Sequence, residues 1–133
     1  MQITRQADYA MRAIYYLSGL EAGKRAATSQ IAKEQNIPPS FLAKIISQLS
    51  VAGLLYTSRG ARGGVSLARD PKEVTMLDVI EAIDGPILLN ECVNDAHGCK
   101  FDKECPMKSL WSEIQDDLVE RLGGTTFADF VGK

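Results

Sequence analysis

The sequence predicts a mainly α-helical chain that carries one small β-hairpin. Two observations predict this class. Apolar residues recur at helical spacing in five separate segments, and a single pair of short strand-like runs flanks a glycine-rich stretch. The chain has 133 residues, which is long enough to bury a hydrophobic core. We therefore expect one domain, or one domain with an extension.

The first two helices are predicted from apolar spacing and from the residues at their ends. The first runs from about Arg5 to Leu20, with Thr4 in the position of an N-cap. Thr28 is predicted to cap a short second helix. The stretch 36–39, Asn-Ile-Pro-Pro, ends that helix, because proline disfavours helical geometry in the residue before it.

The third helix is predicted to begin at Pro39, since proline suits the first helical position, and to run to about Ala52. Gly53 then supplies a left-handed stop. One face is apolar and another is polar. The apolar positions are Leu42, Ile45, Ile46 and Leu49, and the polar ones are Ser40, Lys44, Ser47 and Gln48. Two short helices joined by a tight turn, the second of them half polar, fit a helix-turn-helix.

A β-hairpin is predicted directly after this unit. The strand-like runs 54–58 and 65–68 flank the glycine-rich stretch 59–64, so the hairpin forms a wing. The glycines do not indicate a phosphate-binding loop, because no Gly-Lys-Ser/Thr follows them and a hairpin surrounds them.

Two further helices and a short turn complete the prediction. Thr75 is predicted to cap a fourth helix that ends at Gly85-Pro86, and Thr125 to cap a short last turn. Between them, a long fifth helix ends at Gly123-Gly124. Its apolar face holds Met107, Leu110, Trp111, Ile114, Leu118 and Leu122, and its acidic face holds Glu113, Asp116, Asp117 and Glu120.

The charge is distributed unevenly along the chain. Residues 1–75 hold ten Lys/Arg and five Asp/Glu, and residues 76–133 hold five and twelve. The two parts therefore carry +5 and −7, which sum to the net charge of −2. This asymmetry favours a basic DNA-facing module joined to an acidic part, although two solvated faces segregated by chance are the alternative. We predict a winged helix-turn-helix DNA-binding domain over residues 1–75.

The candidate DNA contacts lie on the third helix and the wing. A recognition helix enters the major groove with its N-terminal residues nearest the bases, which favours Ser40, Lys44 and Gln48. Arg59 and Arg62 lie on the glycine-rich loop, from which a guanidinium can reach a narrow minor groove. The alternative for the helix residues is an ordinary solvated face.

All three cysteines lie in one polar stretch, residues 91–106. An odd number of thiols in a loop is a poor disulfide framework and favours a metal site. Cys92, Cys99 and Cys105 are spaced too widely for a zinc ribbon, but thiolates also hold iron-sulfur clusters. Such clusters usually need four ligands, so one is missing. The candidates are Asp8, His97, Asp102, Glu104 or a thiol from solution, and the alternatives are a zinc site that uses His97 or three ordinary reduced cysteines.

An enzyme and a membrane protein are both disfavoured. The chain has no Gly-x-Ser-x-Gly or His-Glu-x-x-His motif, and His97 is its single histidine. It has no signal-peptide segment and no apolar run of membrane-spanning length. We therefore expect a cytoplasmic protein with reduced thiols.

Nearly the whole chain resembles the winged-helix regulator family that includes the iron-sulfur-assembly regulator IscR, the nitric-oxide sensor NsrR and the iron regulator RirA. The resemblance rests on the opening ten residues, the stretch from Ile31 to Leu54, the wing 59–65, the three cysteines and the Leu110-Trp111 helix that follows them. It implies a homodimer paired through the long fifth helix and bound to a roughly palindromic operator. It also implies that Ser40 to Lys44 lie in the major groove and that Arg59 reaches the minor groove.

The resemblance further implies a cluster-binding loop and dimerisation helix over residues 76–133, with Cys92, Cys99 and Cys105 as ligands. One branch of the family places a histidine shortly after the third cysteine, where this chain has Lys108. Another branch uses an aspartate of the first helix, and Asp8 stands at the matching place. The hypothesis is a 4Fe-4S cluster, with 2Fe-2S as the alternative, held by the three cysteines and by Asp8 of the other subunit.

The expected function is that of a transcription regulator, most simply a repressor, that senses iron-sulfur status, nitric oxide or redox state through this cluster. Two alternatives stay open at this point. The first is a metal-free thiol switch in which the cysteines are oxidised directly. The second is a protein-interaction module whose acidic C-terminal half docks another protein, with the winged helix as scaffold.

Overall fold

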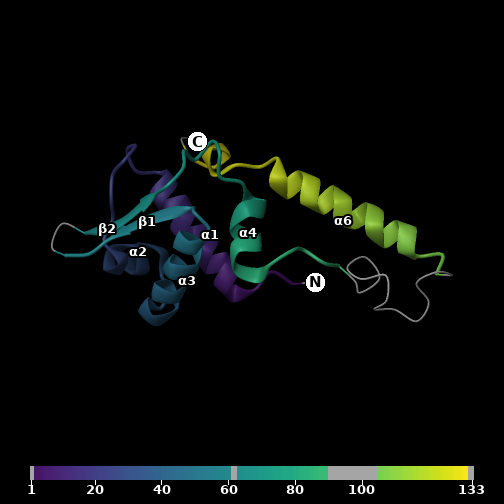
Figure 1. Cartoon of the computed structure of the whole chain (residues 1–133), viewed down its shortest axis with the longest axis horizontal. Helices are drawn as coiled ribbons and strands as arrows, with labels where there is room; N and C mark the ends of the chain where they lie inside the picture. Colours follow the sequence, from purple (N-terminus) through teal and green to yellow (C-terminus); the bar gives the residue numbers. More distant parts are fainter. Residues whose placement is uncertain (1, 61–62, 90–104, 132–133) are drawn as a thin grey trace.

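The computed structural model of the chain describes residues 2–60, 63–89 and 105–131. Within these ranges the chain is mainly α-helical with one hairpin, as the sequence predicts (Figure 1). The elements are α1 (Arg5–Ser18), α2 (Thr28–Gln35), α3 (Pro39–Val51), β1 (Leu55–Ser58), β2 (Gly64–Leu67), α4 (Met76–Asp84), α6 (Lys108–Gly123) and the 3-10 turn η1 (Phe127–Asp129). None of the helices described is both long and apolar enough to cross a membrane.

Helix α1 confirms the predicted cap at Thr4. The Thr4 hydroxyl accepts a hydrogen bond from the backbone N–H of Ala7 over 3.1 Å. The helix ends at Ser18, slightly before the predicted Leu20, and the buried Ser18 hydroxyl donates to the carbonyl of Ile14 over 2.7 Å. The buried Ser18 hydroxyl therefore has a hydrogen-bond partner within its own helix.

The predicted cap at Thr28 is wrong, because Thr28 is already the first residue of α2. The N-cap is Ala27, which makes no side-chain capping bond. The helix therefore begins one residue earlier than predicted. Ala26 is bridged to Val65 through two backbone hydrogen bonds of 2.9 and 2.8 Å, and α2 begins as soon as the chain has left this bridge.

The ends of α3 match the prediction. Pro39 occupies the first turn, and Gly53 adopts the left-handed conformation with φ of 80°. Leu54 N–H donates to the Leu49 carbonyl and Gly53 N–H to that of Ser50, which is the Schellman pattern of a helix C-terminus. This stop turns the chain directly into β1.

The hairpin β1–β2 is antiparallel, with Leu55 opposite Leu67 and Ser58 opposite Gly64. Each strand lies within one residue of its prediction. A Cβ atom on Gly64 would stand 2.8 Å from the Ala26 carbonyl oxygen, so glycine is needed where the Ala26 backbone joins β2. Strand β2 of the wing therefore packs closely against the segment before α2.

The hydrophobic core joins the helix-turn-helix to α4 and η1. Ile14, Leu42, Leu49, Val79 and Phe127 are among its members, and each is at most 1% exposed. Thr75 caps α4 as predicted, in a capping box with Asp78. The predicted cap at Thr125 is wrong. Its carbonyl accepts from Met76 N–H, its hydroxyl donates to the Arg121 carbonyl, and the next residue, Thr126, caps η1 instead.

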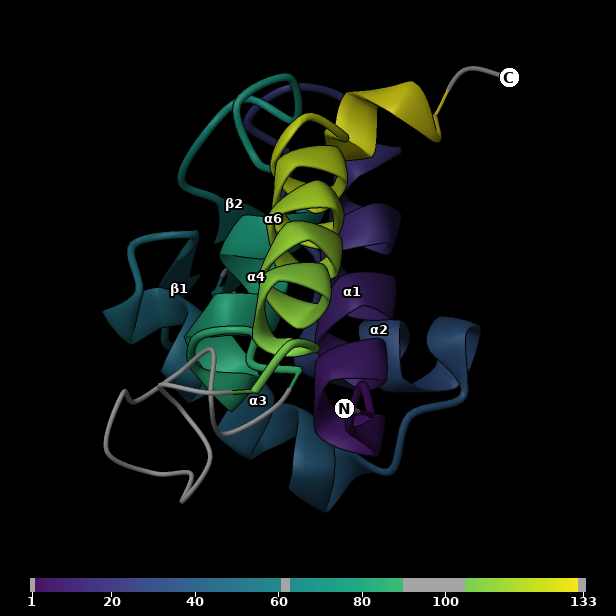
Figure 2. The same ribbon diagram turned by 90° about the vertical axis from the view of Figure 1, so that its right-hand side faces the viewer.

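Helix α6 projects outward from the α4 side of the molecule (Figures 1 and 2). None of its residues is buried in the chain. Its C-terminal end is held, because Phe127 N–H donates to the Val74 carbonyl over 3.0 Å and Thr75 forms an isolated bridge with Thr126. The predicted boundary at residue 75, between a DNA-binding domain and a cluster-binding and dimerisation segment, stays a prediction.

Thr4 also links α1 to α4, and its replacement should destabilise the fold. Its hydroxyl donates to the Asp84 carboxylate over 2.6 Å while it caps α1. We expect Thr4→Ala to lower the free energy of unfolding in urea by about 1 to 2 kcal/mol, the usual cost of a lost helix cap. Thr28→Ala is the matched control, and because Thr28 caps nothing it should change that energy by less than about 0.5 kcal/mol. Equal losses in the two variants would contradict this assignment.

Candidate nucleic-acid interface and sensor segment

The polar face of α3 is presented to solvent by the burial of its opposite face. Leu42, Ile45, Ile46 and Leu49 are at most 6% exposed, as their spacing predicts. Ser40 and Lys44 are exposed. Gln48 is half-buried, and its Oε1 atom is buried with no hydrogen-bond partner among the described residues. Of the three predicted helix contacts, Ser40 and Lys44 are therefore the more accessible.

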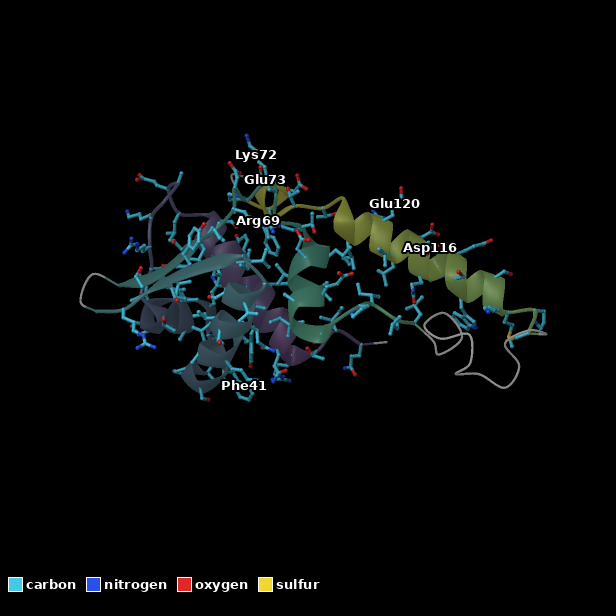
Figure 3. The ribbon with its side chains drawn as sticks, viewed as in Figure 1. Phe41, Arg69, Lys72, Glu73, Asp116 and Glu120 are labelled. Carbon is cyan, nitrogen blue, oxygen red and sulfur yellow. The ribbon has the colours of Figure 1, made fainter. Side chains whose placement is uncertain are left out.

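Phe41 is an accessible residue of this helix that the sequence reasoning missed. Its side chain is 44% exposed, and its ring centroid lies 6.2 Å from that of Tyr9 on α1, with the planes tilted by 53°. Figure 3 places Phe41 at the lower edge of the molecule, away from α6. The signal was available in the sequence, since Phe41 lies outside the apolar stripe that forms the core.

On the wing, Arg59 is exposed and directly follows β1. Gly60 after it has φ of 95°, and the Gly63 N–H donates to the Gly60 carbonyl over 2.9 Å, which closes the hairpin loop. Arg62 lies outside the described residues. The structure thus places Arg59, with an exposed side chain, where β1 ends and the loop of the wing begins.

Asp8 lies on α1 and is accessible. Its side chain is 48% exposed and forms an ion pair of 3.2 Å with Arg12, one helical turn further on. An ion pair this exposed stabilises the helix only weakly, so it leaves the carboxylate free to change partners. Asp8 also lines a hollow of about 580 Å³ with residues 2–5, Tyr9, Arg12 and Asn36.

Cys105 carries a free, half-buried thiol just before α6. Its carbonyl accepts from the Lys108 N–H over 3.3 Å, so the residue belongs to the turn that starts the helix. Cys92, Cys99, His97, Asp102 and Glu104 lie outside the described residues. In the part of the chain that is described, no cluster of three or more His, Cys, Asp or Glu could hold a metal ion.

The start of α1 and the start of α6 lie apart within one chain. Figure 1 shows the start of α6 at the far end of the molecule from the wing, while the start of α1 lies against α4. The segment after α4 is tied to α6, because Leu89 N–H donates to the Gln115 side-chain oxygen over 2.9 Å. This bond fixes where the chain enters the cysteine stretch.

The predicted apolar face of α6 is exposed in the single chain. Met107, Leu110 and Ile114 are 56%, 51% and 40% exposed, and Trp111 and Leu118 are only partly covered. Asp116 and Glu120, which Figure 3 labels on the outer side of the helix, are exposed as well. An exposed apolar stripe of this kind is typical of a surface that packs against another molecule.

Comparisons with known proteins agree with this architecture. A family model, Rrf2, described as an iron-dependent transcriptional regulator, matches residues 3–133. An Aquifex aeolicus protein described as an HTH-type transcriptional regulator is 34% identical over 125 residues, which cover 92% of this chain and 86% of that protein. These relatives are regulators of transcription and not enzymes.

Two solved structures are similar over nearly the whole chain. CymR, the global cysteine regulator of B. subtilis, superposes with a TM-score of 0.81 and 28% identity, over 98% of this chain and 95% of that one. T. potens IscR superposes with a TM-score of 0.77 and 25% identity, over 98% and 85%. The winged fold, the exposed face of α3 and the match over residues 3–133 lead to one conclusion: the chain belongs to the Rrf2 family of DNA-binding transcriptional regulators.

Proposed function

We propose that this protein is a homodimeric, cluster-sensing regulator that binds a roughly palindromic operator. The observation that carries the proposal is the free thiol of Cys105 at the start of an unburied helix, α6, on a DNA-binding fold. The family model's description as iron-dependent supports the same proposal. Repression is the mode we propose.

The donor set fits an iron-sulfur cluster. Cys105 is available as a thiolate ligand, and Asp8 offers a half-exposed carboxylate beside a hollow. Cys92 and Cys99 would complete the three thiolates that the sequence supplies. A 4Fe-4S cluster is the form we propose, with 2Fe-2S as the alternative, and when bound it would supply reactivity toward oxygen, nitric oxide or iron loss.

Asp8 would reach this site from the partner subunit. Within one chain the start of α6 lies far from the start of α1 (Figure 1), so we propose that the carboxylate comes from a second copy of the chain. A twofold axis through paired α6 helices can bring one subunit's α1 toward the other's cysteine segment. A ligand shared between subunits would make the geometry of the dimer depend on the state of the site.

The DNA half of the proposal uses the exposed faces described above. Ser40 and Lys44 on α3 would lie in the major groove, with Gln48 further along the same helix, while Arg59 and Arg62 of the wing would contact the minor groove. Two such units in a dimer read two half-sites whose separation is fixed by the protein. Any change in the relation of the two subunits would therefore change operator affinity.

Anaerobic purification tests the proposal directly. We expect a brown protein whose absorption spectrum shows sulfide-to-iron bands and whose iron and sulfide contents indicate about one cluster per subunit, because three thiolates at one site bind such clusters. Cys105→Ser should lose most of the bound iron, and Ser109→Ala, a hydroxyl change in the first turn of α6, should retain it. Colourless, iron-free protein from oxygen-excluded cells would overturn the proposal.

The fourth ligand is tested by Asp8→Ala. If Asp8 binds iron, the variant should show a changed spectrum and lose its cluster faster in air, since one of four ligands is missing. Arg12→Ala is the matched control, because it breaks the same 3.2 Å ion pair and leaves the carboxylate in place. A spectrum and cluster lifetime identical to those of the wild type would refute the role of Asp8.

A metal-free thiol switch is the second candidate. The observation that favours it is the similarity to CymR, described as a global cysteine regulator, together with the free thiol of Cys105. Aerobic, metal-free protein whose DNA binding is lost on oxidation and restored by a thiol reductant would support this candidate over the cluster.

A further inference from the structure

Phe41 is an apolar residue in the first turn of the helix that would read DNA. Its two neighbours behave differently, since Leu42 is fully buried in the core and Ser40 is exposed. A single exposed aromatic residue on a protein surface is ordinary and needs no explanation. The position of this one is informative, because Phe41 and Lys44 are three residues apart and therefore neighbours on the surface of α3.

The Phe41 ring packs against the ring of Tyr9. The two ring centroids are 6.2 Å apart with a tilt of 53°, which is a favourable aromatic geometry. Tyr9 belongs to α1 and packs against the hydrophobic core. The Phe41 side chain is therefore backed by the folded domain on one side and leaves 44% of its surface to solvent on the other.

Only one apolar group is presented by the bases in the major groove, the C5 methyl of thymine, and phenylalanine is one of the side chains that contacts it. We propose that Phe41 contacts a thymine methyl in each half-site and makes the protein select thymine there. This inference rests on the proposed operator binding through α3. It assigns a base preference to a residue with no hydrogen-bonding group in its side chain.

The composition of the helix end agrees with this assignment. Of the exposed residues in the first turns of α3, Phe41 and Ala43 are apolar, and Lys44 is the one cation among residues 39–47. Few side chains here can make the bidentate contacts that select guanine or adenine. Arg59 on the wing would favour the narrow minor groove of A·T-rich sequence, so both elements select the same kind of site.

The test removes the methyl group alone. A DNA duplex that binds the intact protein is first selected in vitro under anaerobic conditions. Its thymines are then replaced by deoxyuridine one position at a time, with the same replacement made in both half-sites. At one position, removing the methyl group should weaken the affinity of the wild type for DNA. Burying a methyl-sized group contributes about 0.8 kcal/mol, so we expect a loss of about four-fold for each methyl and about fifteen-fold for the two methyls of the symmetric pair. The Phe41→Ala protein should bind the thymine and uracil duplexes equally.

Two further variants keep the test decisive. Phe41→Tyr retains the ring and should retain the discrimination between thymine and uracil. Lys44→Ala should weaken binding to both duplexes by the same factor and leave their ratio unchanged. These controls separate a methyl contact from a general loss of affinity or of folding.

A uracil penalty that is the same in the wild type and in Phe41→Ala would overturn the assignment of Phe41 and leave the proposed function standing. So would a change of oligomeric state in Phe41→Ala by sedimentation, which would make the ring a protein-docking surface. If the wild type selects no duplex in any redox state, the proposed function fails and this inference fails with it.

Discussion

Replacing Leu110 and Ile114 of α6 with glutamine is expected to convert the proposed dimer to monomers at micromolar concentration. These side chains are 51% and 40% exposed in the single chain, so a partner helix would cover the remaining surface. In a twofold-symmetric interface each substitution occurs twice, once in each subunit. Four half-covered apolar side chains at about 1 kcal/mol each amount to about 4 kcal/mol, or about a thousand-fold in the dimer dissociation constant.

The same double variant should bind its operator at least about a hundred-fold more weakly, because each half-site is then held by a separate molecule and the gain from linkage is lost. Sedimentation velocity and anisotropy titration at one salt concentration measure the two effects. Glu113→Gln with Glu120→Gln is the matched control, since it places the same side chains on the exposed acidic positions. It should leave the dimer intact.

Two results would contradict the role of α6. A double glutamine variant that stays dimeric would place the interface elsewhere. A variant that loses its far-UV helical signal would show that Leu110 and Ile114 serve the single chain, against the finding that none of the residues of α6 is buried within it.

Element positions could be predicted well from the sequence where a local signal acts alone. The N-cap at Thr4, proline at the start of α3 and the left-handed Gly53 each depend on a few neighbouring residues. The caps at Thr28 and Thr125 were predicted wrongly because distant backbone pairing decides there. Val65 holds Ala26 extended, and Met76 and Thr75 hold the segment 125–126.

In the candidate site, too, features set by local sequence could be predicted and features set by tertiary packing could not. Exposure of Ser40 and Lys44 followed from the apolar stripe opposite them, and Phe41 lies outside that stripe as well, whereas the contact of its ring with Tyr9 of α1 depends on tertiary packing. The separation between the start of α1 and the start of α6 in one chain was also beyond the sequence pattern. It depends on the direction in which α6 leaves the domain (Figure 1).

Cluster-loaded and cluster-free protein are expected to differ in operator affinity by about 5- to 150-fold, the usual range of coupling between two sites. The structure supplies physical connections through which such coupling can act. The segment entering the cysteine stretch is tied to α6 by Leu89 and Gln115, and the end of α4 is tied to α1 through Asp84 and Thr4. Helix α1 in turn contacts α3 through Tyr9 and Phe41.

Anaerobic anisotropy titrations of both forms, at one fixed salt concentration, measure this ratio. The salt must be held constant because phosphate contacts make affinity fall steeply with ionic strength. Cys105→Ser protein carried through the same treatments is the control, and its affinity should not respond to them. Since a ligand shifts an equilibrium only by its differential affinity for two states, equal binding by both forms would mean that the dimer has the same DNA-binding geometry with and without the cluster. The cluster would then be structural, and sensing would have to act through the thiols themselves.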